Sequence, residues 1–200
     1  MVELQKDCSD QVTKETRNRG FHHVVYACRN SEETRHFYED LLGMPLVHTE
    51  VKNAPDGFFR HLFFDTGDGS CIAFFEVSGV GENPDWSSEV SIGNGLPVWV
   101  NHLAFASDEE RTETVRERLA AEKIVPLMEV DHGWCHSLYY MDPNGIMVEF
   151  CRDTGEFGVD PEIAAERLSS TEDTDYSTFI QPLDVEGLRG FSLFPTPKDA

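Results

Sequence analysis

The feature that most constrains the fold is an internal repeat, because two stretches of this chain follow the same plan. Residues 21–27 and 100–106 open the two copies, and each run carries a histidine at the same place, His23 and His102. In each copy a charged helical segment, a proline-led strand, a glycine-containing turn and a final apolar strand follow. The repeat sets the architecture, since each copy is one structural unit with a face to bury.

Side-chain patterns in the first copy predict a β-α-β-β-β order. Residues 21–27 alternate and are rich in β-branched and aromatic side chains, which predicts a strand. Ser31 is expected to be the N-cap of a helix that runs to about Leu42, with Phe37 inward, and Gly43 is expected to end it in the left-handed conformation. Further strands are predicted at residues 58–64 and 71–77.

The second copy repeats this order. Residues 107–110 read Ser-Asp-Glu-Glu and predict a capping box at the start of a helix that ends near Glu122. The tetrapeptide Asp-Pro-Asn-Gly at 142–145 predicts a tight turn before the last strand. The strands themselves are predicted near residues 127–130, 137–141 and 146–151.

The predicted fold class is α+β, with two tandem β-α-β-β-β modules that form a cupped, barrel-like mixed sheet, plus a C-terminal extension. Both modules are expected to belong to one structural domain. An Asp160-Pro161 pair predicts a short helix in the extension, and its apolar tail is expected to dock on the protein. The expected segments are an N-terminal arm at 1–19, the first module at 20–77, a linker at 78–98, the second module at 99–153 and the extension at 154–200.

Composition excludes several classes of protein. The formal net charge is −21, from 37 acidic and 16 basic residues, and such a surface repels nucleic acids and anionic membranes. The five cysteines are odd in number and lack a C-x-x-C pair, which favours reduced thiols over a disulfide framework or a structural zinc site. The N-terminus lacks a signal-peptide pattern, and no apolar run is long enough to span a membrane. We therefore expect a cytoplasmic protein.

The chain resembles the vicinal oxygen chelate superfamily at His23, at the run Phe-Tyr-Glu-Asp-Leu-Leu-Gly of residues 37–43, and at the 142–145 turn with Glu149. This superfamily includes glyoxalase I, extradiol ring-cleaving dioxygenases, fosfomycin-resistance thiol transferases, methylmalonyl-CoA epimerase and bleomycin-binding proteins. The resemblance covers roughly residues 20–152. It implies paired modules whose curved sheets enclose one metal ion.

The resemblance also implies the metal ligands, which are His23, His102 and Glu149. Two histidines and one carboxylate from three strands make a facial triad with open positions, an arrangement typical of non-haem Fe(II). Mn(II), Zn(II) or Ni(II) are the alternative metals. Glyoxalase-type members use a fourth, carboxylate ligand, and Ala73 stands at that position here unless Glu76 fills it through a register shift.

Two residues are predicted to be catalytic from the likeness to extradiol dioxygenases. Tyr139, four residues before Pro143, is expected to hydrogen-bond an oxygen of the substrate or one derived from O2. His136 is expected to be the acid/base, with His132 as the alternative, because an imidazole titrates near neutrality. Aromatic side chains are expected to line the pocket or to belong to the core: Phe58, Phe59, Phe63, Phe64, Phe74, Phe75 and Trp134.

The function predicted from these residues is an Fe(II)-dependent extradiol-type dioxygenase that uses O2 to cleave a catechol-like aromatic. A glyoxalase- or epimerase-like lyase or isomerase is the first alternative, although Ala73 argues against it. A metal-free protein that binds a small molecule is the second, and the two histidines with Glu149 argue against that. The resemblance also implies a homodimer.

Overall fold

A computed structural model of the chain describes residues 20–83, 86–88, 90–172, 174 and 177–181. The chain divides into two compact units, Met1–Trp86 and Ser87–Ala200. The boundary falls within the linker predicted at 78–98. The predicted N-terminal arm and the apolar end of the tail, residues 182–200, lie outside the described residues.

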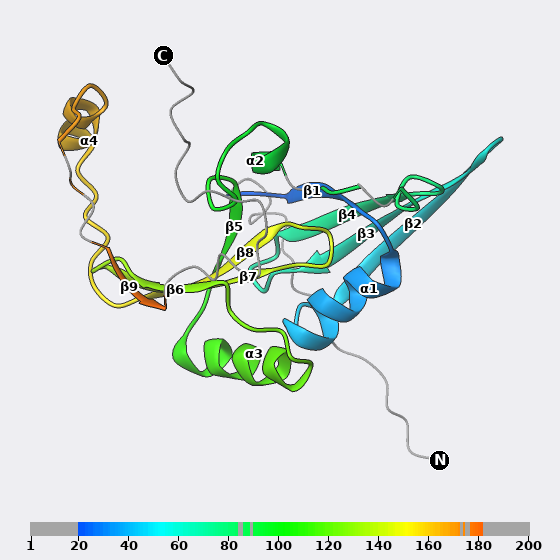
Figure 1. The fold of residues 1–200 in the computed structure, drawn as a ribbon, viewed down its shortest axis with the longest axis horizontal. Coiled ribbons are helices and arrows are strands. Elements are labelled where there is room, and N and C mark those ends of the chain that lie inside the picture. The colour runs from blue at the N-terminus through cyan, green and yellow to red at the C-terminus, as the bar shows by residue number, and fades with distance from the viewer. Residues whose placement is uncertain (1–19, 84–85, 89, 173, 175–176, 182–200) are drawn as a thin grey trace. The chain divides into compact units, whose positions relative to one another are not determined.

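The first unit has the predicted β-α-β-β-β order (Figure 1). Its strands form one mixed sheet in the order β1-β4-β3-β2, in which β1 is parallel to β4 and the other pairs are antiparallel. The elements are β1 (His23–Cys28), α1 (Ser31–Arg35), the π-helix η2 (His36–Leu41), β2 (Leu46–Ala54), β3 (Gly57–Asp65) and β4 (Cys71–Val77).

The helical segment covers one face of this sheet. Tyr38 is fully buried, and its ring packs against Phe64 at 5.6 Å and Phe74 at 4.8 Å between centroids. Phe37 and Leu41 are buried beside it, as the sequence pattern predicts. We call this side of each sheet the helix face and the opposite side the front face. Burial of each large apolar side chain contributes about 1.5–3 kcal/mol, so this packing holds the helix on the sheet.

Both predicted helix starts are wrong by one residue. Asn30, not Ser31, is the first N-cap, and its side-chain oxygen accepts hydrogen bonds from the backbone N–H groups of Glu32 and Glu33. Asp108 caps the second helix by accepting from the N–H of Arg111. Asn and Asp cap at least as well as Ser, and they occupy the extended position from which the side chain reaches the first turn.

The second unit repeats the order and adds elements of its own (Figure 1). Its sheet has the order β5-β8-β7-β6-β9, with β5 parallel to β8, and α3 covers its helix face with Val115 and Leu119 buried. The elements are α2 (Val90–Gly93), β5 (His102–Ala106), α3 (Glu109–Ala121), β6 (Met128–Asp131), β7 (Cys135–Met141), β8 (Met147–Asp153), α4 (Pro161–Arg167) and β9 (Thr178–Gln181).

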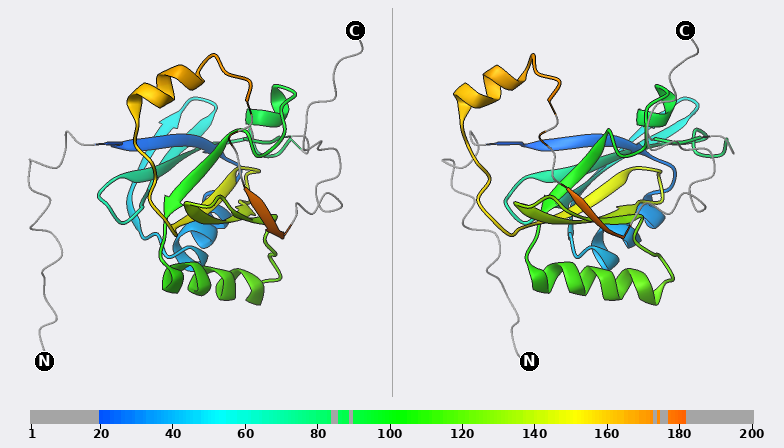
Figure 2. Two further views of the ribbon diagram at one scale, coloured as in Figure 1. Left: turned by 90° about the vertical axis from the view of Figure 1, so that its left-hand side faces the viewer. Right: turned by 60° about the vertical axis from the view of Figure 1, so that its left-hand side comes forward.

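The C-terminal extension returns to the sheet of its own unit. Asp160 caps α4 as predicted, but no side chain of this helix is buried, and Figure 2 shows it standing apart from the sheet. The chain then pairs β9 antiparallel with β6, where Phe179 lies opposite Val130. The sequence predicted that the tail docks but not that it adds a strand. β9 has only four residues, too few for their pattern to predict a strand, and it forms only because the edge of β6 is free to pair with it.

No helix among the described residues has the length and hydropathy needed to cross a membrane. Cys71, Cys135 and Cys151 are free thiols.

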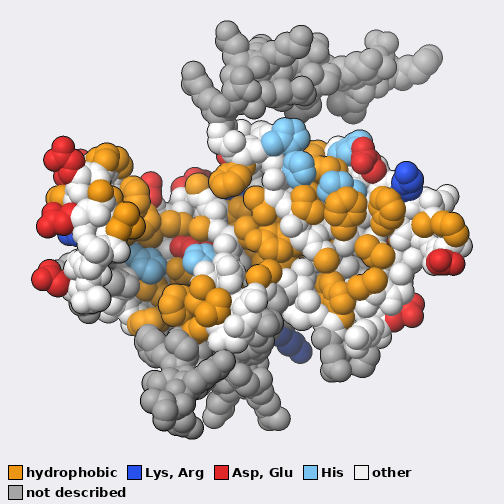
Figure 3. Space-filling model, turned by 90° about the horizontal axis from the view of Figure 1, so that it is seen from above, with side chains coloured by type: hydrophobic (Ala, Val, Ile, Leu, Met, Phe, Trp, Pro, Cys, Tyr) orange, Lys and Arg blue, Asp and Glu red, His pale blue; other side chains and the backbone are white. Residues whose placement is uncertain are grey.

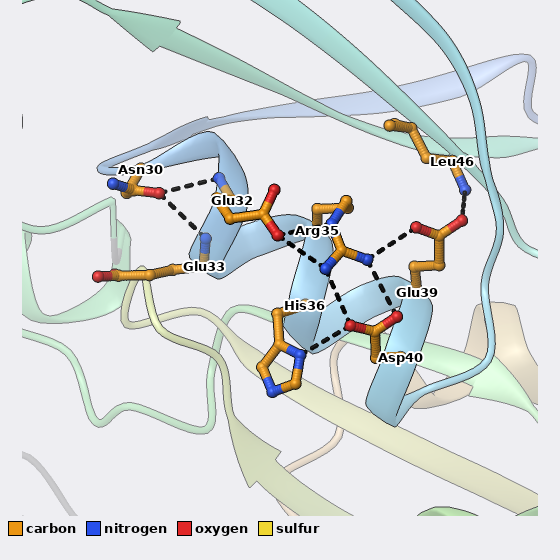
Figure 4. A network of polar contacts seen from close by, with 8 residues as sticks. All are labelled: Asn30, Glu32, Glu33, Arg35, His36, Glu39, Asp40 and Leu46. Carbon is orange, nitrogen blue, oxygen red and sulfur yellow. Dashed lines mark hydrogen bonds and ion pairs between the residues drawn. The ribbon is translucent and has the colours of Figure 1, made fainter.

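An ion-pair network joins the helical segment of the first unit to the start of β2 (Figure 4). The guanidinium of Arg35 lies 2.7 Å from Glu32, 3.0 Å from Glu39 and 2.9 Å from Asp40. Glu39 also accepts a hydrogen bond from the backbone N–H of Leu46 at 3.1 Å. These carboxylates hold the pKa of Arg35 above its usual range, and Arg35 lowers the pKa of Asp40 to about 2. The network therefore ties the helix end to the next strand.

We expect Arg35→Ala to lower the free energy of unfolding by more than the loss of a single exposed ion pair does, because three carboxylates lose their shared partner. Urea unfolding measures the change, and it should shrink in high salt. Glu117→Ala, at an exposed position of α3, is the control, with an expected change within about 0.5 kcal/mol. Equal changes for the two variants would contradict the role given to Arg35.

Candidate functional site

Strand registers show which positions of the two units correspond. In the first sheet His23 lies opposite Cys71 and Val25 opposite Ala73. In the second sheet His102 lies opposite Met147 and Ala104 opposite Glu149. Matching the two histidines therefore places Ala73 at the position of Glu149, on the front face. Alanine has no metal-binding atom, so the first unit lacks a carboxylate at this position.

Glu76 does not replace the missing carboxylate. It lies opposite Cys28, which puts its side chain on the helix face of the first sheet. There Arg60 approaches it to 2.5 Å, and the hydroxyl of Ser31 donates a hydrogen bond to it. A one-residue shift along a strand reverses the face, and Glu76 is three residues from Ala73. The register shift required for a fourth ligand is absent from the described part of this sheet.

The second unit brings two of the predicted ligands together on its front face. Nε2 of His102 lies 2.9 Å from Oε2 of Glu149, whose side chain is only 7% exposed. Nδ1 of His102 is 2.8 Å from the carbonyl oxygen of Trp99, and the hydroxyl of Ser137 donates to Oε1 of Glu149 at 2.5 Å. In each of these two side chains, one metal-binding atom thus points at the other side chain, and the second polar atom is hydrogen-bonded to a neighbouring residue.

This pair shifts the pKa of both its members. The hydrogen bond to Glu149 raises the pKa of His102, against the opposing effect of burial. Burial acts to raise the pKa of Glu149, but the hydrogen bonds from His102 and Ser137 outweigh it, and the pKa is lowered. Both shifts favour the ionised pair in the metal-free protein.

His23 lies at the start of β1, on the front face of the first sheet, with its side chain exposed. Its Nδ1 is 2.7 Å from Nδ1 of His22, which fits one hydrogen bond between the two rings. The rings of His22 and His23 also contact each other, at 5.0 Å between centroids. The strand begins only at His23, so strict alternation does not reach the preceding residue. Nε2 of His23 is left for a ligand.

Tyr139 and His132 form a second polar pair beside Glu149. Tyr139 lies opposite Glu149 on the neighbouring strand and is buried. Its hydroxyl is 3.1 Å from Nε2 of His132, and Nδ1 of His132 is 2.7 Å from the hydroxyl of Ser177, just before β9. Burial and the charge of Glu149 hold the pKa of Tyr139 well above its usual value, so the phenol is protonated at neutral pH.

The structure does not bring His136 to Glu149. His136 lies opposite Arg152 and shares the helix face of the second sheet, because it is an odd number of positions from Tyr139 along β7. Its Nε2 is 2.9 Å from Glu129, and Arg116 of α3 lies 3.1 Å from the same carboxylate. Of the two histidines considered as acid/base, His132 is therefore the one on the side of Tyr139.

Sequence reasoning missed the partners that orient these groups. Ser137 shares the front face with Tyr139, two residues along β7, and this spacing was a usable signal once the strand was placed. The carbonyl of Trp99 and the hydroxyl of Ser177 have no such signal, because their positions depend on a loop and on the β9 pairing. The predicted aromatic residues divide between the faces: Phe64 and Phe74 are core, while Phe59, Phe63 and Phe75 lie on the front face.

The donor set of the second unit suits a divalent metal. Two ligands at about 2.1 Å from one ion and at right angles have donor atoms about 3 Å apart, close to the separation of His102 and Glu149. Metal-binding histidines commonly donate the other ring N–H to a carbonyl, as His102 does to Trp99. Among the described residues no three His, Cys, Asp or Glu side chains are grouped closely enough to hold a metal, and the second unit by itself supplies two of the predicted ligands.

A cavity of about 540 Å³ in the second unit borders this region, because its lining includes Ala104, which lies opposite Glu149. Its lining includes Ser107, Asp108 and Asp153, at the ends of β5 and β8, but neither His102 nor Tyr139. The hydrogen-bonded groups around Glu149, rather than this cavity, define the candidate site.

Comparisons with known proteins agree with the fold. The family model of the Glyoxalase/Bleomycin resistance protein/Dioxygenase superfamily matches residues 20–150. A lactoylglutathione lyase of Neisseria meningitidis serogroup A is 27% identical over 131 residues, which cover 64% of this chain and 86% of that protein. A glyoxylase/bleomycin resistance protein/dioxygenase domain from Frankia sp. EAN1pec is similar in structure, with a TM-score of 0.55, 18% identity, and coverage of 68% of this chain and 98% of that one.

A third similar structure is that of a mutant of the fosfomycin resistance protein FosX from Listeria monocytogenes, complexed with Mn(II) and 1S,2S-dihydroxypropylphosphonic acid. Its TM-score is 0.49 at 17% identity, and the match covers 74% of this chain and 97% of that one.

The pairing of His102 with Glu149 predicts a measurable coupling in metal-free protein. A double-mutant cycle of His102→Gln and Glu149→Gln should give a coupling energy of about 1–3 kcal/mol, because the two side chains share a buried hydrogen bond. Urea unfolding of the four proteins in the presence of a chelator measures it. The control cycle combines His102→Gln with Glu129→Gln, on the opposite face, and should give less than about 0.5 kcal/mol. Equal couplings in the two cycles would rule out the pair.

Proposed function

The chain belongs to the Glyoxalase/Bleomycin resistance protein/Dioxygenase superfamily, and on this premise we propose that it is a metal-dependent enzyme that binds a small substrate through two vicinal oxygens. The proposed ligands are His23, His102 and Glu149. The observation that carries the proposal is the pair of His102 and Glu149, in which each donor atom faces the other and each remaining polar atom is held by Trp99 or Ser137. Such second partners are typical of metal ligands.

The proposed chemistry divides between the cation and the chain. A divalent cation supplies Lewis acidity to the two substrate oxygens. Tyr139 is protonated at neutral pH and donates a hydrogen bond to a substrate oxygen on the front face. His132 is hydrogen-bonded to the hydroxyl of Tyr139 and to that of Ser177. It accepts a proton from the substrate, or returns one, through the hydroxyl of Tyr139.

Within this class we propose Fe(II)-dependent cleavage of a catechol-like ring by O2. In this reaction the ring bond between one hydroxyl-bearing carbon and its neighbour without a hydroxyl breaks, and both atoms of O2 enter the product. Support comes from the set of three ligands, from Ala73 where a fourth carboxylate would lie, and from the pair of Tyr139 and His132. Three ligands leave the open positions that a chelating substrate and O2 both require.

The second candidate is a metal-assisted lyase or isomerase. The relative named lactoylglutathione lyase favours it, at 27% identity. Two observations argue against it, because proton transfer in that reaction calls for a carboxylate at the position of the first unit that matches Glu149. That position is Ala73, and the nearby Glu76 is paired with Arg60. A homodimer and a cytoplasmic location stay predictions from the resemblance and the composition.

Metal analysis tests the ligand set directly. We expect anaerobically purified protein to hold about one divalent ion per chain, and His23→Ala, His102→Ala and Glu149→Ala to lose it, because a three-ligand site does not survive the loss of one ligand. His136→Gln, on the helix face, is the control and should keep the metal. Metal retained by His102→Ala or by Glu149→Ala would overturn the site, and metal retained only by His23→Ala would remove that residue from it.

Oxygen uptake separates the two candidate reactions. We expect Fe(II)-loaded protein to consume O2 with at least one member of a catechol panel and to release a yellow ring-opened product. His132→Gln should lower kcat by about 10²-fold or more, the usual effect of losing a general acid/base, whereas His136→Gln should leave it within about twofold. Formation or cleavage of lactoylglutathione without O2 uptake would favour the lyase. An iron-loaded enzyme inactive with the whole panel would contradict ring cleavage.

A further inference from the structure

Four of the chain's eight histidines gather on the front side of the first unit. Three of them surround Phe63, whose ring centroid lies 5.4 Å from that of His23, 5.5 Å from that of His48 and 4.1 Å from that of His61. His22 contacts His23 in turn. Figure 3 shows histidine side chains gathered among hydrophobic ones on this surface. On a chain with a net charge of −21, a cluster of imidazoles and aromatic rings is a distinct chemical environment.

His61 is held in this cluster by ring packing. It lies on β3 opposite Phe75, and the two rings stack at 3.8 Å between centroids with an angle of 16°. Phe63 covers it at 45° from the neighbouring position of the same face. Two aromatic contacts therefore set the orientation of the imidazole, and no hydrogen bond is needed to do so.

One ring nitrogen of His61 has no partner. Nε2 is shielded from solvent and has no hydrogen-bond partner among the described residues. A buried polar atom left unpaired lowers the stability of the folded chain. A phenylalanine would fill a site between two aromatic rings without this cost. The imidazole therefore destabilises the chain at a place where an apolar ring would stabilise it, which is typical of a group kept for a ligand.

We propose that His61 is a specificity-determining residue. Its Nε2 is shielded in the substrate-free chain; when the substrate displaces the neighbouring rings, it donates a hydrogen bond to an acceptor group on the substrate ring. The inference rests on the proposed function, in which His23 is a metal ligand. The ring centroids of His23 and His61 are 6.2 Å apart, so one aromatic ring held by its vicinal oxygens at His23 reaches His61 with a substituent. The flat environment of Phe63 and Phe75 suits an aromatic ring.

The charges around His61 select a neutral acceptor over an anion. Glu50 lies directly opposite His61 on β2 and also approaches His48 to 3.3 Å. A carboxylate substituent would meet this negative charge, whereas a carbonyl or nitro oxygen accepts the hydrogen bond without repulsion. The substrate class is therefore a catechol-like ring with a neutral hydrogen-bond acceptor away from its two hydroxyls.

Thermal unfolding of the ligand-free protein tests the unpaired nitrogen without any metal or substrate. His61→Phe keeps the aromatic ring and removes both nitrogens, and we expect it to raise Tm by about 2–4 °C. His48→Phe is the matched control on the same face, because His48 is exposed and paired with Glu50, and it should not raise Tm. A lower Tm for His61→Phe would identify a structural histidine and overturn the proposal.

Binding of two probes to Zn(II)-loaded protein tests the specificity. Absorbance and calorimetric titrations give Kd for catechol and for 4-nitrocatechol, whose nitro group is a neutral acceptor. The preference is the ratio of the Kd for catechol to the Kd for 4-nitrocatechol. We expect His61→Phe to lower this ratio about tenfold relative to the unsubstituted chain, which is the effect of one lost hydrogen bond. His48→Phe should leave the preference unchanged.

The outcomes separate this inference from the proposed function. If the unsubstituted protein binds catechol but the preference is the same in His61→Phe, His61 does not read the substituent and the inference fails alone. If the unsubstituted protein binds neither probe, binding through vicinal oxygens fails, and the inference falls with it. A raised Tm together with a reduced preference supports both.

Discussion

The two-residue period of a β-strand is the constraint on which the rest of this structure depends. Parallel pairing of β5 with β8 sets Glu149 on the front face, and antiparallel pairing with β7 sets Tyr139 next to it. The same period turns His136 and Glu76 to the helix face, where they pair with Glu129 and Arg60. Each sheet thus has a face that packs against its helix and a front face, and one step along a strand exchanges them.

The front faces of the two sheets differ although their folds match. In the second unit polar groups are paired: His102 with Glu149, and Tyr139 with His132. In the first unit the corresponding carboxylate position is Ala73, and the face is built from imidazole and phenyl rings instead. The two copies therefore share a fold, while one front face carries paired polar groups and the other carries imidazole and phenyl rings.

Partners distant in sequence hold the groups of the second unit. Ser177 lies 45 residues from His132 and reaches it only because β9 joins the edge of the sheet. The extension thus contributes to the environment of Tyr139 although it follows the repeat. Such hydrogen bonds restrict the rotation of His132, and in the proposed mechanism this restriction keeps its Nε2 on the phenol.

The sequence by itself determined the repeat, the order of strands and helices, Gly43 in the left-handed conformation and the α4 cap, because these depend on local patterns and on spacing within one copy. It also aligned Glu149 of the second copy with Ala73 of the first. Only the tertiary structure put His132 rather than His136 beside Tyr139, oriented His102 through Trp99 and added β9. Those features depend on which face of a sheet a side chain takes and on contacts between segments far apart in the chain. A local sequence pattern predicts neither of these.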